Sequence, residues 1–300
     1  MRFCWVALLV LVLVGCGTDT RRDGGEHIVV TTNILGDVVS NLVGESADVT
    51  VLMKRNADPH SFELSAQQAD AVSRAELIVY NGLGLEEGVQ HHVDAAAGRG
   101  VATLAVGDRI DAISFSGGDT ENAPDPHFWM DPERMIAAVD VIEAALVERL
   151  PGATRIPANA QAYREQLREL SDLMTQRFSE IPEDRRALVT NHHVLGYLAR
   201  RYGLTVVGAV VPSGTTLASP APSDLEALSA AIRQTGVKTI FVDTSQPDRL
   251  ARALASQSGV DVDVVSLYSE SLDEPGTAAG TYLDMMTANT DTIIAGLSGN

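Results

Sequence analysis

Residues 159–178, NAQAYREQLRELSDLMTQRF, decide how this chain is divided. Apolar side chains recur there at roughly helical spacing, and the positions between them are rich in Arg, Glu and Gln. A helix of about 20 residues is about 30 Å long, which is enough to run the height of a small domain. We therefore expect residues 151–181 to form one stiff helix that joins an N-terminal lobe, residues 27–150, to a C-terminal lobe, residues 182–300.

On each side of this segment, short β-branched runs alternate with helical patterns. The first set of runs is 28–30, 49–52, 77–80 and 101–104, and the second is 187–190, 205–207, 239–242 and 262–265. Helical patterns occupy 34–43, 65–74, 86–97, 224–234, 248–258 and 281–297. Alternating strands and helices predict parallel sheets covered by helices. The predicted fold is α/β, with two lobes that each contain a four-stranded, mainly parallel sheet.

The N-terminus predicts export and a lipid anchor. Arg2 precedes an apolar run, residues 3–14, which is shorter than the ~20 residues that a membrane-spanning helix needs. Residues 1–15 are typical of a signal peptide, and Leu13-Val14-Gly15-Cys16 resembles the bacterial lipobox, in which the cysteine is lipidated. Residues 16–26 then form a polar, glycine-rich tether. The alternative is an ordinary signal peptide with an incidental cysteine.

Composition restricts the possible functions. Cys4 lies in the signal and Cys16 would carry lipid, so the exported domain has no thiol and depends on its apolar core. A net charge of −18 and a pI near 4.6 argue against nucleic-acid binding, which requires a basic face. We expect an extracytoplasmic monomer on the outer side of the cell membrane.

Four short segments each contain a potential metal ligand: His60, His127, His192 and Glu270. Three imidazoles and one carboxylate make a complete tetrahedral set for zinc. Three of the four follow predicted strands, and ligands of open parallel sheets bind beyond the carboxyl ends of the strands. The fourth, His127, is held between two prolines and lies beside Trp129, which could exclude water.

Histidines beyond strands are more often hydrogen-bonded structural residues than ligands. We give that interpretation to His27, which adjoins the tether, and to His91 and His92, which lie in a polar helical stretch. Glu270 taken alone could be a surface carboxylate. The combination of four such segments with an export signal and two lobes favours the metal site.

Taken together, these segments resemble a known family, the metal-binding substrate-binding lipoproteins of ABC importers for zinc and manganese, which includes zinc-uptake and adhesin-like proteins. The resemblance rests on residues 29–34 (VVTTNI), 59–63 (PHSFE), 126–132 (PHFWMDP), 192–204 (HHVLGYLARRYGL), 271–276 (SLDEPG) and 281–286 (TYLDMM). It implies two lobes linked by one long helix, a metal held between them, and an ABC permease as partner. Matched residue by residue, it implies the ligands His60, His127, His192 and Glu270, with His193 turned away or supporting the site.

The chain departs from the family pattern at two places. The last ligand is usually aspartate, whereas Glu270 has one more methylene and could bind through one oxygen or both. Residues 116–125, SGGDTENAPD, contain no histidine, although many zinc-binding members have a histidine-rich loop there.

Rival functions remain open at this point. One is a secreted zinc hydrolase, which would keep an open water position, although the chain has no His-Glu-x-x-His sequence. Another is a lipoprotein of the same fold that binds manganese or an organic solute, or that acts as an adhesin. We expect a non-enzymatic protein that binds zinc, with manganese possible, because nitrogen-rich sites favour zinc over manganese. We also expect affinity to fall below about pH 6.5, where imidazoles take up protons.

Overall fold

The computed structural model describes residues 27–115 and 122–299. The predicted signal peptide, Cys16 with its predicted lipid, and the predicted tether lie outside the described residues, as does most of the acidic loop at 116–125. Among the helices of the described part, none has the length and apolarity that crossing a membrane would require.

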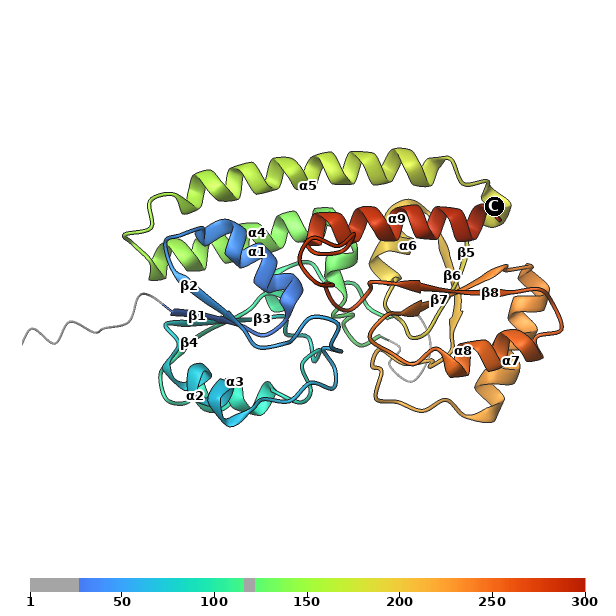
Figure 1. The fold of residues 1–300 in the computed structure, drawn as a ribbon, viewed down its shortest axis with the longest axis horizontal. Coiled ribbons are helices and arrows are strands. Elements are labelled where there is room, and N and C mark those ends of the chain that lie inside the picture. Colours follow the sequence, from blue (N-terminus) through green and yellow to red (C-terminus); the bar gives the residue numbers. More distant parts are fainter. Residues whose placement is uncertain (1–26, 116–121, 300) are drawn as a thin grey trace, which may run out of the picture.

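The N-terminal lobe is built on a parallel sheet with the strand order β2-β1-β3-β4. Its strands are β1 (His27–Val30), β2 (Asp48–Val51), β3 (Leu77–Tyr80) and β4 (Ala102–Ala105). Helix α1 (Asn33–Val43) covers one face, and α2 (Ala66–Arg74) and α3 (Gln90–Ala97) cover the other (Figure 1).

The C-terminal lobe repeats this order as β6-β5-β7-β8, again with parallel pairing throughout. Its strands are β5 (Ala187–Thr190), β6 (Thr205–Ala209), β7 (Thr239–Asp243) and β8 (Asp263–Leu267). Helices α6 (Gly196–Tyr202) and α9 (Tyr282–Ser298) cover one face, and α7 (Pro222–Thr235) and α8 (Arg249–Gln257) cover the other. The predicted α/β fold with two four-stranded lobes is confirmed.

One long helix packs on both lobes, and a second long helix lies beside it. The predicted long helix is present as α5 (Ile156–Ser179), and it packs against α1 of the first lobe and α9 of the second. Beside it lies α4 (Pro132–Arg149), which the sequence patterns did not reveal (Figure 1). Its start has a clear local cause, because the Asp131 side chain accepts a hydrogen bond from the backbone N–H of Glu133 and Pro132 occupies the first turn.

One apolar cluster runs through both lobes and the helices that join them. It contains Val38 of α1, Ile142 of α4, Leu167 of α5 and Ile293 of α9, each fully buried. The outer faces of the two sheets have separate, smaller clusters under α2 and α3 and under α7 and α8. The lobes therefore share a core on the side of α4, α5 and α9.

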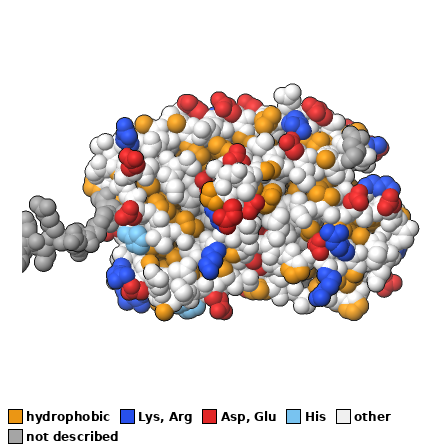
Figure 2. Space-filling model, in the orientation of Figure 1, with side chains coloured by type: hydrophobic (Ala, Val, Ile, Leu, Met, Phe, Trp, Pro, Cys, Tyr) orange, Lys and Arg blue, Asp and Glu red, His pale blue; other side chains and the backbone are white. Residues whose placement is uncertain are grey.

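Charged side chains are spread over the surface. Figure 2 shows acidic and basic groups interspersed across one face of both lobes, without a continuous basic area among the described residues on view.

Candidate metal centre

His60 lies in a tight turn that follows β2. The Oδ1 atom of Asp58 accepts a hydrogen bond from the backbone N–H of His60 at 2.9 Å, and the Asp58 carbonyl accepts one from the backbone N–H of Phe62 at 3.1 Å. These bonds fix the turn, and the His60 side chain points inward with 1% of the residue exposed.

His127 is held in the same way by Asp125. The Oδ1 atom of Asp125 accepts from the backbone N–H of His127 at 2.9 Å and lies 2.7 Å from its Nδ1. Burial raises the pKa of Asp125 to about 7. In its ionised form this carboxylate accepts from Nδ1–H, which leaves Nε2 with a lone pair. The Trp129 ring, 5.2 Å away between centroids, covers the imidazole, which is fully buried.

His192 comes two residues after the end of β5. Its carbonyl accepts a hydrogen bond from the Thr190 hydroxyl at 2.5 Å, and the backbone N–H of its neighbour His193 donates to the Ser213 carbonyl at 3.0 Å. The two adjacent imidazoles diverge: His192 is fully buried in the centre, whereas His193 is half-buried and lines a neighbouring cavity with Phe115 and Asp125.

Glu270 lies in the loop after β8, and Asp243 at the end of β7 holds that loop. The Oδ2 atom of Asp243 accepts from the backbone N–H groups of Ser269 and Glu270, both at 2.9 Å, and from the Ser269 hydroxyl at 2.7 Å. The Trp129 indole donates to the Ser269 carbonyl at 2.8 Å. The loop is thus fixed from both lobes.

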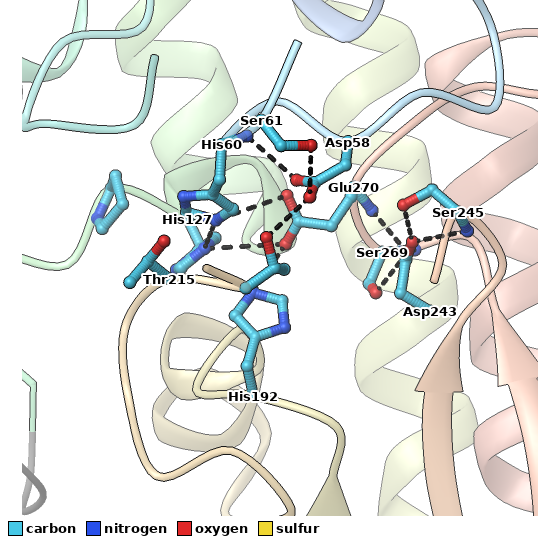
Figure 3. A network of polar contacts seen from close by, with 12 residues as sticks. Asp58, His60, Ser61, His127, His192, Thr215, Asp243, Ser245, Ser269 and Glu270 are labelled. Carbon is cyan, nitrogen blue, oxygen red and sulfur yellow. Dashed lines mark hydrogen bonds and ion pairs between the residues drawn. The ribbon is translucent and has the colours of Figure 1, made fainter. Parts of the chain in front are cut away.

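The structure brings all four sequence-predicted side chains together. Figure 3 shows His60, His127 and His192 around Glu270, and one donor atom of each lies within 4.8 Å of the others. The Nε2 atoms of His60 and His127 are 3.4 Å apart, and Glu270 Oε1 is 3.0 Å from His192 Nε2 and 3.6 Å from His127 Nε2. Nitrogens about 2.1 Å from a tetrahedral zinc lie about 3.4 Å apart, so the cluster has the size that one ion requires.

Burial controls the charge of these groups. It lowers the pKa of His60, His127 and His192, and for His60 and His127 the neighbouring imidazoles lower it further. Burial also raises the pKa of Glu270 well above its ordinary value, and nearby carboxylates act in the same direction. Without a cation, the centre therefore favours neutral imidazoles and a protonated carboxyl.

The hydrogen-bonding pattern of the centre fits a bound cation. Both Glu270 carboxyl oxygens and the Nε2 of His192 are buried without a hydrogen-bond partner among the described residues. Buried polar atoms are normally paired, and each unpaired one is costly. A divalent cation is a single group that could satisfy these acceptor atoms at once.

The three remaining histidines that we interpreted as structural lie elsewhere. His27 is in β1 and bonds to Thr50, while His91 and His92 stack on each other in α3. Sequence reasoning missed the supporting carboxylates Asp58 and Asp125. A signal was present, since Asp-Pro-His occurs at residues 58–60 and again at 125–127.

Comparison with known proteins agrees with this geometry. Residues 28–296 match the family model described as zinc-uptake complex component A, periplasmic. The chain belongs to this family. The predicted family resemblance, to the metal-binding substrate-binding proteins of ABC importers, is thereby confirmed.

Relatives within the zinc-uptake component A family differ in the metal that they are named for. The manganese-binding lipoprotein MntA of Halalkalibacterium halodurans is 33% identical over 298 residues, which cover 98% of this chain and 97% of the relative. The zinc-binding protein TroA of Treponema pallidum is 32% identical over 308 residues, covering 99% and 98%.

Solved structures show the same two-lobed fold. The periplasmic zinc binding protein TroA from Treponema pallidum superposes with a TM-score of 0.85 at 31% identity, over 91% of this chain and 99% of that chain. A Mn-bound periplasmic metal binding protein from Candidatus Liberibacter asiaticus gives 0.79 at 27% identity, again over 91% and 99%.

Proposed function

We propose that this protein captures one divalent transition metal, zinc, between its lobes and delivers it to an ABC permease. The single observation that carries the proposal is the fully buried cluster of three imidazoles and one carboxylate whose atoms face one another. In this proposal His60, His127 and His192 bind through Nε2 and Glu270 binds through its carboxylate.

The identity of the metal follows from the donor atoms. Relatives named for zinc and for manganese have similar sequence identity to this chain, so sequence similarity does not decide between the two metals. Three neutral nitrogen donors and one carboxylate favour zinc, because manganese prefers more oxygen ligands and lies below zinc in the general order of affinity. Both oxygens of the longer Glu270 side chain lie near imidazole nitrogens. Oε1 is 3.0 Å from the Nε2 of His192, and Oε2 is 4.0 Å from the Nε2 of His60.

A zinc hydrolase is disfavoured by the same cluster. Four protein donors complete a tetrahedral zinc, and a catalytic site keeps a position open for water. The four side chains are at most 1% exposed, so a substrate has no direct access to the ion.

The test is elemental analysis of the mature protein purified without a tag, beside a chelator-stripped sample that is reloaded. We expect one divalent ion per chain and, in a competition titration at neutral pH, zinc bound in preference to manganese. Equal or preferential manganese binding would reverse the metal assignment and leave transport intact. A stoichiometric sugar or amino acid with no metal would refute the proposal.

The cellular position is proposed from the sequence alone. Residues 1–15 would be removed, and Cys16 would hold a monomeric protein on the outer side of the membrane near its permease. Cys16→Ser is expected to release the processed protein from membranes without changing its metal content. A processed Cys16→Ser protein that stayed with the membrane fraction would refute lipid anchoring.

A further inference from the structure

The two Asp-Pro-His turns share one contact and differ in the rest. In both, the aspartate Oδ1 accepts from the backbone N–H of the histidine two residues on, at 2.9 Å. Asp125 then binds the imidazole of its own histidine, His127. The Asp58 carboxylate does not do this, and the Nδ1 atom of His60 has no partner among the described residues.

The second oxygen of Asp58 bonds across the lobe interface instead. Its Oδ2 accepts from the Ser61 hydroxyl at 3.0 Å within the turn (Figure 3). It also accepts from the Thr216 hydroxyl at 2.6 Å and from the Gln246 side-chain amide at 2.7 Å, and both of these residues belong to the C-terminal lobe. Asp58 is 7% exposed, so these bonds are largely shielded from water.

Gln246 connects Asp58 to the loop of the fourth ligand. It lies in the turn after β7, where Asp243 Oδ1 accepts from the backbone N–H of Ser245 at 2.7 Å. The other oxygen of Asp243 holds the backbone of Glu270. The side chains of Asp58, Gln246 and Asp243 therefore link the turn that carries His60 to the loop that carries Glu270.

We propose that Asp58 is a positioning residue that fastens the two lobes beside the metal and slows metal release without binding the ion. This rests on the proposed function. Moving His60 away from His192 and Glu270 requires that the bonds from Thr216 and Gln246 break. Hydrogen bonds to an ionised, shielded carboxylate are the strong ones, so breaking them delays opening.

The decisive variants leave the carboxylate in place. Thr216→Val and Gln246→Met each remove one donor from the C-terminal lobe, keep the volume similar and leave the charge near the metal unchanged. At about 1.5 kcal/mol or more for each bond to a charged group, we expect each to speed metal dissociation about tenfold or more, and the pair still further. Dissociation is followed by stopped-flow mixing of the zinc-loaded protein with excess chelator.

Two controls separate this role from general destabilisation. Thr244→Val removes an exposed threonine hydroxyl from the same turn as Gln246 and should leave the rate unchanged. Thr216→Ser restores the donor and should return the rate close to wild type. All variants should bind one zinc per chain, and their metal-free forms should stay folded, with melting temperatures lowered by no more than the few degrees that the lost bonds imply.

A double-mutant cycle tests the contact itself. Asp58→Asn keeps an oxygen that can accept from the His60 backbone but replaces the shared acceptor. Adding Thr216→Val to Asp58→Asn should therefore change the rate much less than it does in the wild type. The proposal would be overturned if the variant with both Thr216→Val and Gln246→Met released zinc at the wild-type rate. It would also be overturned if the effects of Asp58→Asn and Thr216→Val on the dissociation rate were fully additive. Failure of the wild type to bind zinc would refute the proposed function instead.

Discussion

The two sides of the lobe interface are built from different interactions. On the helix side, where α5 packs against α1 and α9, the contact is apolar and belongs to one continuous core. On the loop side, around the candidate metal centre, the lobes meet through polar pairs, such as Asp58 with Thr216 and Glu87 with Thr215. Apolar packing holds the lobes in place without a ligand. Polar pairs can be exchanged for water, so we expect the metal to enter and leave on the loop side.

The largest effect is expected from removing a donor at the loop side. His192→Ala takes one imidazole from a cluster within which donor atoms lie 4.8 Å apart or less. Losing a supporting hydrogen bond costs up to about 100-fold in metal affinity, and we expect the loss of a ligand to exceed that. His193→Ala should stay near wild type, because that side chain lines the neighbouring cavity. Chelator-buffered zinc titrations measure both.

The adjacent histidines form a matched pair for this experiment, since they differ by one position and share a strand end. Equal losses, or a larger loss for His193→Ala, would contradict the assignment of His192 as the ligand.

Substitutions on the helix side should instead lower the stability of the fold and leave metal binding intact. Leu167 of α5 is fully buried in the shared core, and Leu167→Ala is expected to lower the free energy of unfolding by about 2–5 kcal/mol. Leu173 lies on the same helix with 40% of its surface exposed, so Leu173→Ala should cost much less. Denaturant unfolding of the metal-free protein gives both values.

The metal content of these two variants shows whether a loss of stability is separate from a loss of metal binding. Both should still bind one zinc per chain as long as they remain folded, because neither leucine contacts the donor cluster. If Leu167→Ala were as stable as Leu173→Ala, the helix side would not be the apolar attachment that we describe.

The pH dependence should come from Glu270 rather than from the imidazoles. Burial lowers the pKa of all three imidazoles, so in the folded protein they remain neutral below the pH of about 6.5 at which free histidine titrates. The pKa of Glu270 is raised, so the metal-free protein holds a proton there that zinc must expel. Affinity should therefore fall about tenfold per pH unit once pH drops below the pKa of Glu270.

Calorimetry in buffers of different ionisation enthalpy counts the released protons, and Glu270→Gln is the control. That variant should bind more weakly and lose most of the pH dependence. A slope that persisted in Glu270→Gln would assign the competing protons to the imidazoles, as the sequence alone suggested.

The sequence predicted the strands well because each β-branched run is short and bounded by helical patterns. It missed α4, although Asp131-Pro132 marks the start of a helix, because the apolar and polar positions after it do not separate into a clear stripe. It selected the four residues that the structure gathers, since each one follows a strand or lies in a turn. It did not reveal the long-range bonds of Asp58 and Asp243, because their partners come from distant loops that only the folded chain brings together.

The smallest effect is expected in overall shape. The shared core and the continuous α5 resist a wide hinge between the lobes, in contrast to binding proteins that close about extended linkers. Solution scattering of metal-free and zinc-loaded protein should therefore give nearly the same radius of gyration. The variant that lacks the Thr216 and Gln246 donors should also keep this radius, because breaking polar pairs frees loops and leaves α5 in place. A large contraction on adding zinc would mean that α5 bends or that the shared core separates, and the helix side would then be the moving part.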